Sequence, residues 1–190
     1  MARSYSDQAV HRSQIDHIID AALRSPSAGN TRGQRLVVVT DPAVQMAIAE
    51  AANERSYVAK GLPPWLSSAP VIVAVGSDES AYRGRYAEQD KQTSTVAGSD
   101  GSWTVPWWWV DAGATIMTLL LAAEDEGMSA GFLGAHACPD VASIVGFGPG
   151  VHFVGLVTIG HPTDHQPRSA SLDRQRPGQV SWLDGTSADR

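Results

Sequence analysis

Three groups of residues in this chain could together hold a flat, phosphorylated ligand. Residues 25–30, SPSAGN, offer hydroxyls and an amide from a loop, and the three tryptophans at 107–109 offer flat surfaces. Arg3, Arg174 and Arg176 offer fixed positive charge, and the guanidinium fork matches the oxygens of a phosphate group. This combination predicts a planar cofactor that carries a phosphate.

Signatures of hydrolases and metalloenzymes are absent from the sequence. It has no Gly-x-Ser-x-Gly elbow, no Walker loop and no Cys-x-x-Cys pair. His161 and His165 have the spacing of a metal-binding pair, but Pro162 places them in a loop, and a zinc site needs three or four converging ligands. Cys138 is interpreted as a small buried side chain rather than a nucleophile. We therefore expect neither a metal site nor a catalytic nucleophile.

The composition limits the class of partner and the location. A length of 190 residues suits a single domain, 1–190, and 43% apolar residues are enough for a core. The formal net charge of -6 argues against a nucleic-acid partner, and no apolar run is long enough to cross a membrane. One cysteine excludes an internal disulfide, and the N-terminus has no apolar signal segment, so we expect a cytoplasmic protein.

The stretch at 107–127 organises the predicted fold. From residue 112 to residue 123 nearly every side chain is apolar or small, which is typical of a helix with no face left for water. Gly127 is a natural stop after the acidic residues at 124–126. Such a helix lies either in the core of one chain or in an interface between subunits, beside a site capped by the tryptophans.

The other segments alternate between helices and short apolar strands. An amphipathic helix is predicted over 12–24, and a second begins with Asp41 as the N-cap and Pro42 at the first helical position. The alternation is not a regular βαβ rhythm, and it indicates a mixed sheet covered by helices. The remaining predicted elements are helices at 79–89 and 139–145, strands at 36–40, 71–75, 130–133 and 151–159, a polar loop at 90–104, and an extended arm at 165–190 with a short strand at 180–182.

In their order and spacing, three motifs resemble the nitroreductase family of flavoproteins. The first is LRSPSAGN at 23–30, which runs into the strand at 36–40. The second is WWWVDAGA at 107–114, which continues to LAA and then to Gly127. The third is the final strand with Gly-His-Pro, followed by RQRP at 174–177. The match extends from near residue 3 to near residue 183.

This resemblance implies an α+β fold with a mixed central sheet flanked by helices, in a homodimer that exchanges its C-terminal arms. It also implies FMN bound at the dimer interface, with residues of both chains at each site. NADH or NADPH would reduce the FMN, which would pass electrons to nitroaromatics, quinones or similar acceptors by a ping-pong mechanism. The cofactor carries this chemistry, so no side chain has to act as a nucleophile.

The resemblance also assigns residues to the cofactor. Arg3 matches a basic position near the flavin pyrimidine, and the loop at 25–30 matches the one that reaches the flavin from one subunit. Residues 133 and 134 match the segment that lines the ring, and the arginines at 174–176 match the pair that holds the phosphate. The implied cofactor-binding set is Arg3, Ser25, Pro26, Ser27, Asn30, Leu133, Gly134, Arg174 and Arg176.

Two departures from the family pattern keep alternatives open. The family usually has Arg-x-Ser shortly before the position of Arg3, where this chain begins, which implies a truncated start, a weaker grip on phosphate or a different ligand. Arg32-Gly33-Gln34 stands where the family often has Gln-Pro-Trp, and Arg32 would favour an acidic substrate, a phosphorylated nicotinamide or a deazaflavin. The alternatives are a deazaflavin-dependent reductase and a non-catalytic protein that sequesters a flavin or deazaflavin. On the substrate side we expect Arg32, Tyr82, Arg85, Tyr86, Lys91, Trp107 and Trp108.

Overall fold

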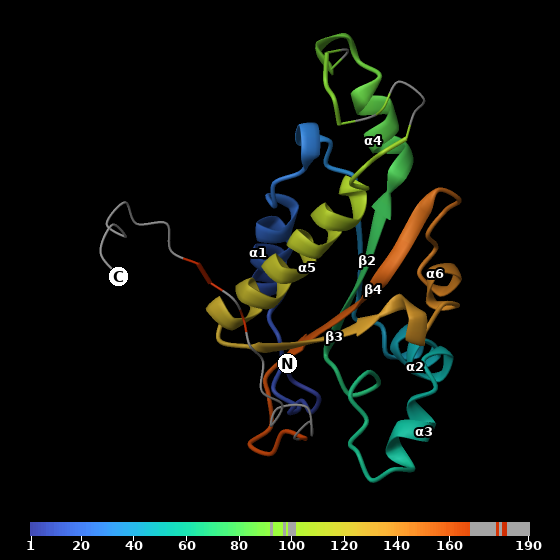
Figure 1. The fold of residues 1–190 in the computed structure, drawn as a ribbon. Coiled ribbons are helices and arrows are strands. Elements are labelled where there is room, and N and C mark those ends of the chain that lie inside the picture. The colour runs from blue at the N-terminus through green and yellow to red at the C-terminus, as the bar shows by residue number, and fades with distance from the viewer. Residues whose placement is uncertain (92, 97, 99–101, 168–177, 179, 182–190) are drawn as a thin grey trace, which may run out of the picture.

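The structure is a computed structural model that describes residues 1–91, 93–96, 98, 102–167, 178, 180 and 181. These residues form an α+β fold, as predicted (Figure 1). The helices are α1 (Arg12–Leu23), α2 (Pro42–Ala51), α3 (Glu54–Val58), α4 (Glu79–Tyr86), α5 (Trp107–Asp125) and α6 (Val141–Ile144), with the short 3-10 turns η1 (Ala28–Asn30), η2 (Gln89–Lys91) and η3 (Ala135–Ala137). The strands are β1 (Gln34–Val39), β2 (Val71–Asp78), β3 (Ser129–Gly134) and β4 (Val151–Gly160).

The four strands form one sheet in the order β1-β2-β4-β3, and each neighbouring pair runs antiparallel. The described sheet is therefore antiparallel throughout, whereas the irregular alternation of elements predicted a mixed sheet. A parallel pair would need a further strand. The strand predicted at 180–182 is not found where it is described, because Val180 and Ser181 belong to no strand, and Trp182 lies outside the described residues.

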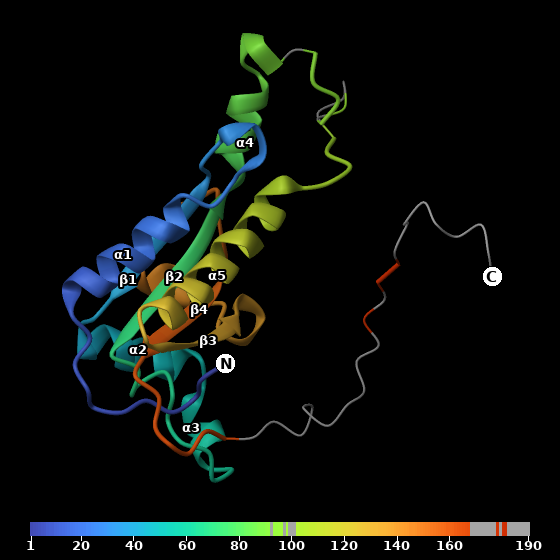
Figure 2. The same ribbon diagram turned by 90° about the vertical axis from the view of Figure 1, so that its left-hand side faces the viewer.

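Helices cover both faces of the sheet (Figures 1 and 2). The odd-numbered β2 residues Val71, Val73 and Val75 pack with α1 and α5, because successive side chains of a strand point to opposite faces. The even-numbered Ile72 and Ala74 pack with α2 and α6 on the other face. β2 is thus buried on both sides, which explains its unbroken apolar sequence.

Most predicted local signals are found where expected. α1 coincides with the predicted helix and buries Ile15, Ile18 and Ala22 along one face. The Asp41 carboxylate accepts from the Ala43 backbone N–H at 2.7 Å, so it caps α2 as predicted. β2 continues beyond residue 75 to residue 78, because the strand resumes its pairing with β4 after a bulge. The helix predicted at 139–145 is shorter in the structure, where it consists of α6 only.

Helix α5 differs from its prediction in one respect. The expected burial on every side is wrong for the single chain, because one face is open to solvent. Met117 is 54% exposed and Leu121 is 62% exposed, and Val110 and Trp109 are nearly half exposed. Val110, Met117 and Leu121 follow one another at i, i+7 and i+11, which places them on one side of the helix. We call this set, with Trp109, the α5 stripe. None of the helices in the described part of the chain is long and apolar enough to cross a membrane.

The N-terminal arm packs across the edge of the sheet. The Ala2 N–H donates to the Ala130 carbonyl at 2.9 Å, and a side chain at Gly131 would place its Cβ 2.4 Å from the Ala2 carbonyl oxygen. Tyr5 is buried, and its hydroxyl lies 2.6 Å from the Thr158 hydroxyl. The arm therefore has a fixed path, and this path determines where Arg3 lies.

Tyr5 gives a prediction for alkaline stability. Burial is the main cause that raises the pKa of Tyr5 to about 12, from an ordinary value of about 10. Because the pKa is higher in the folded state than in the unfolded state, the stabilisation that comes from the Tyr5 hydroxyl is complete below pH 10. It is lost as the pH rises through 12. The Tyr5→Phe variant should be less stable than the wild type at neutral pH, and this difference should shrink by about 2–3 kcal/mol between pH 9 and pH 12. Urea unfolding across this range measures it, and two parallel curves would contradict it.

Candidate functional site

A cavity of ≈ 620 Å³ lies at the β3 edge of the sheet, next to the N-terminal arm. Three aromatic side chains, one cation and a run of backbone line it, which suits a flat ring with polar edges. The lining residues are Arg3, Trp109, Phe132, Leu133, Gly134, Ala135, His136, Phe153 and Val154.

Arg3 lines this cavity, and Tyr57 and Trp65 hold its guanidinium in place. Arg3 Nη1 donates to the Tyr57 hydroxyl at 2.7 Å, and the guanidinium carbon lies 5.4 Å from the centre of the Trp65 ring. The Arg3 backbone N–H donates to Gln166 Oε1 at 2.8 Å. Within the described residues no carboxylate forms an ion pair with Arg3, so its charge stays available to a ligand.

The backbone that carries the Trp65 ring is held by a buried carboxylate. Glu54, at the start of α3, accepts from the backbone N–H groups of Trp65 at 2.8 Å, Leu66 at 2.6 Å and Ser67 at 3.3 Å. This carboxylate thus stands in for the missing backbone partners of a tight turn. Since α3 also supplies Tyr57, one short helix supports both groups that hold Arg3.

The end of β3 brings backbone rather than side-chain chemistry to the cavity. Leu133 and Gly134 pair with Leu156 and Gly155 of β4, which fixes their carbonyl and N–H directions. A Cβ at position 134 would lie 2.9 Å from the His136 ring, so glycine lets that ring fold over the strand end. Leu133 and Gly134 line the same cavity as Arg3, and their contact with a flavin stays a prediction.

The predicted loop at 25–30 lies elsewhere, packed against α4 and α5. Its polar side chains are largely engaged within the chain. The Ser25 hydroxyl is buried and donates to the Thr118 hydroxyl at 2.9 Å. Ser27 Oγ accepts from the Arg32 N–H at 3.0 Å, and Asn30 Oδ1 accepts from Arg32 Nε at 3.3 Å. Pro26 and Asn30 are exposed, as is Arg32.

A buried carboxylate of α5 anchors this loop. Asp111 Oδ2 accepts from the Ala28 backbone N–H at 2.8 Å and from the Tyr82 hydroxyl at 2.8 Å. Tyr82 is 1% exposed, so the prediction that it faces a substrate is wrong for this chain: its hydroxyl is an internal donor. Burial first, and then the bond to the Asp111 carboxylate, raise the pKa of Tyr82 well above its ordinary value.

The other residues predicted on the substrate side gather on and around α4. Arg85, which was predicted on the substrate side, donates to Asp90, Glu88 and the Gly29 carbonyl, and these bonds give it a structural role. Trp108 is buried and contacts Trp103 edge-on at 5.3 Å between ring centres, so it too does not face an open pocket. Lys91 Nζ lies 5.7 Å from the Tyr86 ring centre, and Trp107 is half-buried at the start of α5.

Within the described chain, some residues of the predicted cofactor-binding set share the cavity, and others lie away from it. Arg3, Leu133 and Gly134 share the cavity, while none of the loop residues at 25–30 lines it. Arg174 and Arg176 lie outside the described residues.

Sequence reasoning missed Glu54, Tyr57, Trp65 and Asp111. Only the fold brings Tyr57 and Trp65 to Arg3, and Glu54 to the turn at Trp65. Asp111 did carry a signal, as an acid beside a long apolar run.

Comparison with known proteins shows the family of the chain. The model of the nitroreductase family matches residues 1–161. The chain is 28% identical over 175 residues to the FMN reductase [NAD(P)H] of Bacillus subtilis, covering 91% of this chain and 66% of that protein, so it spans just under two thirds of that relative. It is 27% identical over 188 residues to a NADH dehydrogenase of Thermus thermophilus, covering 92% and 88%.

Solved structures show the same fold. The crystal structure of a nitroreductase family protein from Streptococcus pneumoniae superposes with a TM-score of 0.65 at 17% identity, covering 100% of this chain and 94% of the other. A family model that matches most of the chain, together with this fold, settles the classification. The chain belongs to the nitroreductase family.

Proposed function

We propose that the protein is an FMN-dependent oxidoreductase, which takes reducing equivalents from NADH or NADPH and passes them to a nitroaromatic, a quinone or a similar acceptor by a ping-pong mechanism. The observation that carries the proposal is the cavity in which Arg3, aromatic rings and the end of β3 meet. Membership of the nitroreductase family and the names of the two sequence relatives support it.

The residues of the cavity fit a flavin. Phe132, Phe153 and Trp109 offer faces or edges to a flat ring, and the strand end at 133–134 offers backbone groups for its polar edge. Arg3 brings a cation that forms no ion pair with the described part of the chain, and this charge would stabilise negative charge on a ring that gains electrons. When bound, FMN supplies the hydride and electron chemistry, while the protein binds, orients and tunes it. We expect no catalytic side chain and no metal.

A second copy of the chain would complete the site. The loop at 25–30 and the cavity are separate within one chain, and the α5 stripe leaves an apolar surface uncovered. A two-fold homodimer packed through α5 would cover this surface and could bring the loop of one subunit to the cavity of the other. Exchange of the C-terminal arms, and a cytoplasmic location, belong to the same proposal. The buried free Cys138 is compatible with a reducing compartment.

The arginines of the arm give a direct prediction. Replacing both Arg174 and Arg176 with alanine should weaken FMN binding by about 3–6 kcal/mol, because each charge-assisted bond to a phosphate contributes about 1.5–3 kcal/mol. Fluorescence titration of the ligand-free protein with FMN measures the change. Riboflavin, which lacks the phosphate, should bind the variant and the wild type equally. An unchanged FMN affinity would show that the arm does not hold the phosphate.

The test of the function is a visible spectrum of the purified protein under anaerobic conditions, before and after NADPH or NADH is added. We expect a two-band flavin spectrum that bleaches with a nicotinamide and returns when a nitroaromatic or quinone follows. If the flavin bleaches only with a reduced deazaflavin, the electron donor is the deazaflavin and not a nicotinamide. Flavin that no donor reduces would favour a sequestering protein. Failure to bind added FMN would overturn the proposal.

A further inference from the structure

The loop that joins α1 to β1 has an uncommon backbone conformation. Gly29, Asn30 and Arg32 all have positive φ, at 62°, 54° and 55°. Two of these residues carry side chains, which rarely occupy the left-handed region unless the surroundings hold them there. The loop therefore needs partners that fix its shape.

Bonds within the loop supply part of this support. The Asn30 N–H donates to the Ser27 carbonyl at 2.8 Å, and the Thr31 hydroxyl donates to the Ala28 carbonyl at 2.6 Å. These bonds close the turn but do not tie it to the rest of the fold. The loop is tied to the rest of the fold by Thr118 and Asp111 of α5 on one side and by α4 on the other.

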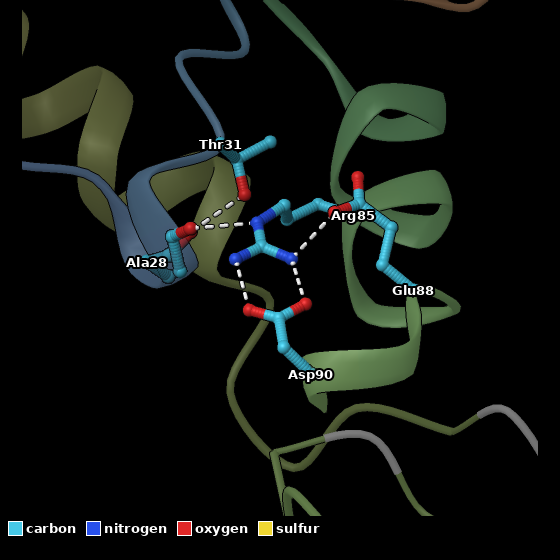
Figure 3. Close-up of polar contacts among 6 residues, drawn as sticks. Ala28, Thr31, Arg85, Glu88 and Asp90 are labelled. Carbon is cyan, nitrogen blue, oxygen red and sulfur yellow. Dashed lines mark hydrogen bonds and ion pairs between the residues drawn. The ribbon is translucent and has the colours of Figure 1, made fainter. Parts of the chain in front are cut away.

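The hydrogen bond from α4 to the loop is made by the Arg85 guanidinium, shown in Figure 3. Arg85 Nε donates at 2.9 Å to the carbonyl of Gly29, the first of the positive-φ residues. The Tyr86 ring lies directly against Gly29, where a Cβ would be 3.0 Å from it. The Arg85 side chain is only 21% exposed, so it is enclosed between the loop and the helix.

The same guanidinium is fixed from its far side. Arg85 Nη1 and Nη2 donate to the two oxygens of Asp90, each at 2.7 Å, and Nη1 also donates to Glu88 Oε2 at 2.7 Å. Such a two-pronged pair sets the plane of the guanidinium as well as its position. Because Nε lies in that plane, Asp90 determines where the bond to Gly29 points.

We propose that Arg85 is a positioning residue for the loop at 25–32, and that Asp90 acts on this loop through Arg85 without touching it. The proposal rests on the proposed function for one point only, namely that the loop contacts FMN of the partner subunit.

The test compares Arg85→Ala, Arg85→Lys and Asp90→Asn. Hydrogen exchange of the ligand-free protein should show that amides at 28–32 exchange roughly tenfold faster in each variant, the factor expected from loss of one charge-assisted bond. Exchange in α5 should stay unchanged, which separates a local release from general destabilisation. The dissociation constant for FMN should rise by a similar factor. Lysine keeps the charge but not the planar fork, so it should behave as alanine does.

Arg12→Ala and Asp16→Asn are matched controls, because they break a surface ion pair of the same type at the far end of α1. Neither should alter exchange in the loop or FMN affinity. The Arg85→Ala, Asp90→Asn double variant should equal Arg85→Ala alone, because Asp90 acts only through Arg85. Additive effects, full rescue by lysine, or unchanged exchange at 28–32 would each overturn the proposal. Wild-type protein that fails to bind FMN would overturn the function instead, and the exchange data would still decide the role of Arg85.

Discussion

Replacing Asp111 with alanine is expected to lower the free energy of unfolding by about 2–4 kcal/mol. The Asp111 carboxylate is nearly buried and accepts from both the Ala28 N–H and the Tyr82 hydroxyl. Removing it leaves two donors without an acceptor, and a buried unpaired donor costs about 1–3 kcal/mol. Urea unfolding at a fixed protein concentration measures the loss, because a dimer's apparent stability depends on concentration.

Two variants make this experiment specific. Tyr82→Phe removes only one of the two donors and keeps the carboxylate bonded to Ala28, so its effect should be about 1 kcal/mol. Asp125→Ala removes an exposed acid from the end of the same helix and should change stability by less than about 0.5 kcal/mol. A loss as small in Asp111→Ala as in Asp125→Ala would mean that the buried carboxylate does not anchor the loop.

Asp111 also shows which part of the site could be predicted from the sequence. Periodicity and composition predicted α1, α2, α5 and the positions of all four strands, because burial and capping act on neighbouring residues. The same reasoning placed Tyr82 and Arg85 in a substrate pocket, because an aromatic or charged side chain on a helix looks accessible in a sequence. Their partners, Asp111 and the Gly29 carbonyl, are distant in the chain, and only the fold brings them together.

The cavity also shows that sequence patterns do not reveal contacts between residues that are distant in the chain. The family resemblance groups Arg3, Leu133 and Gly134, which spacing alone does not, and the three residues line one cavity. Their role toward a flavin stays a prediction. Glu54 belongs to no motif, yet it shapes the turn that places Trp65 behind Arg3. Residues that act on a ligand can be found by motif, whereas residues that position them are found from hydrogen bonds and packing.

The second large effect is expected at the α5 stripe. Leu121→Glu should convert the proposed dimer into monomers, because it places a charge on the most exposed apolar side chain of α5, which is 62% exposed in the single chain. Burial of a leucine contributes about 1.5–3 kcal/mol, and a two-fold interface would contain the substitution twice. The dimer dissociation constant should therefore rise at least about 100-fold, as measured by sedimentation over a range of concentrations.

FMN binding should be lost together with the dimer, and this link tests whether the site is shared between subunits. Met46→Glu is the matched control, because it puts the same charge on an exposed apolar side chain of α2, on the other face of the sheet. It should leave both the dimer and the FMN affinity unchanged. A Leu121→Glu monomer that binds FMN as tightly as the wild type would show that one chain holds the flavin alone. A dimer that survives the substitution would move the interface away from α5, and the apolar face of this helix would then need another occupant.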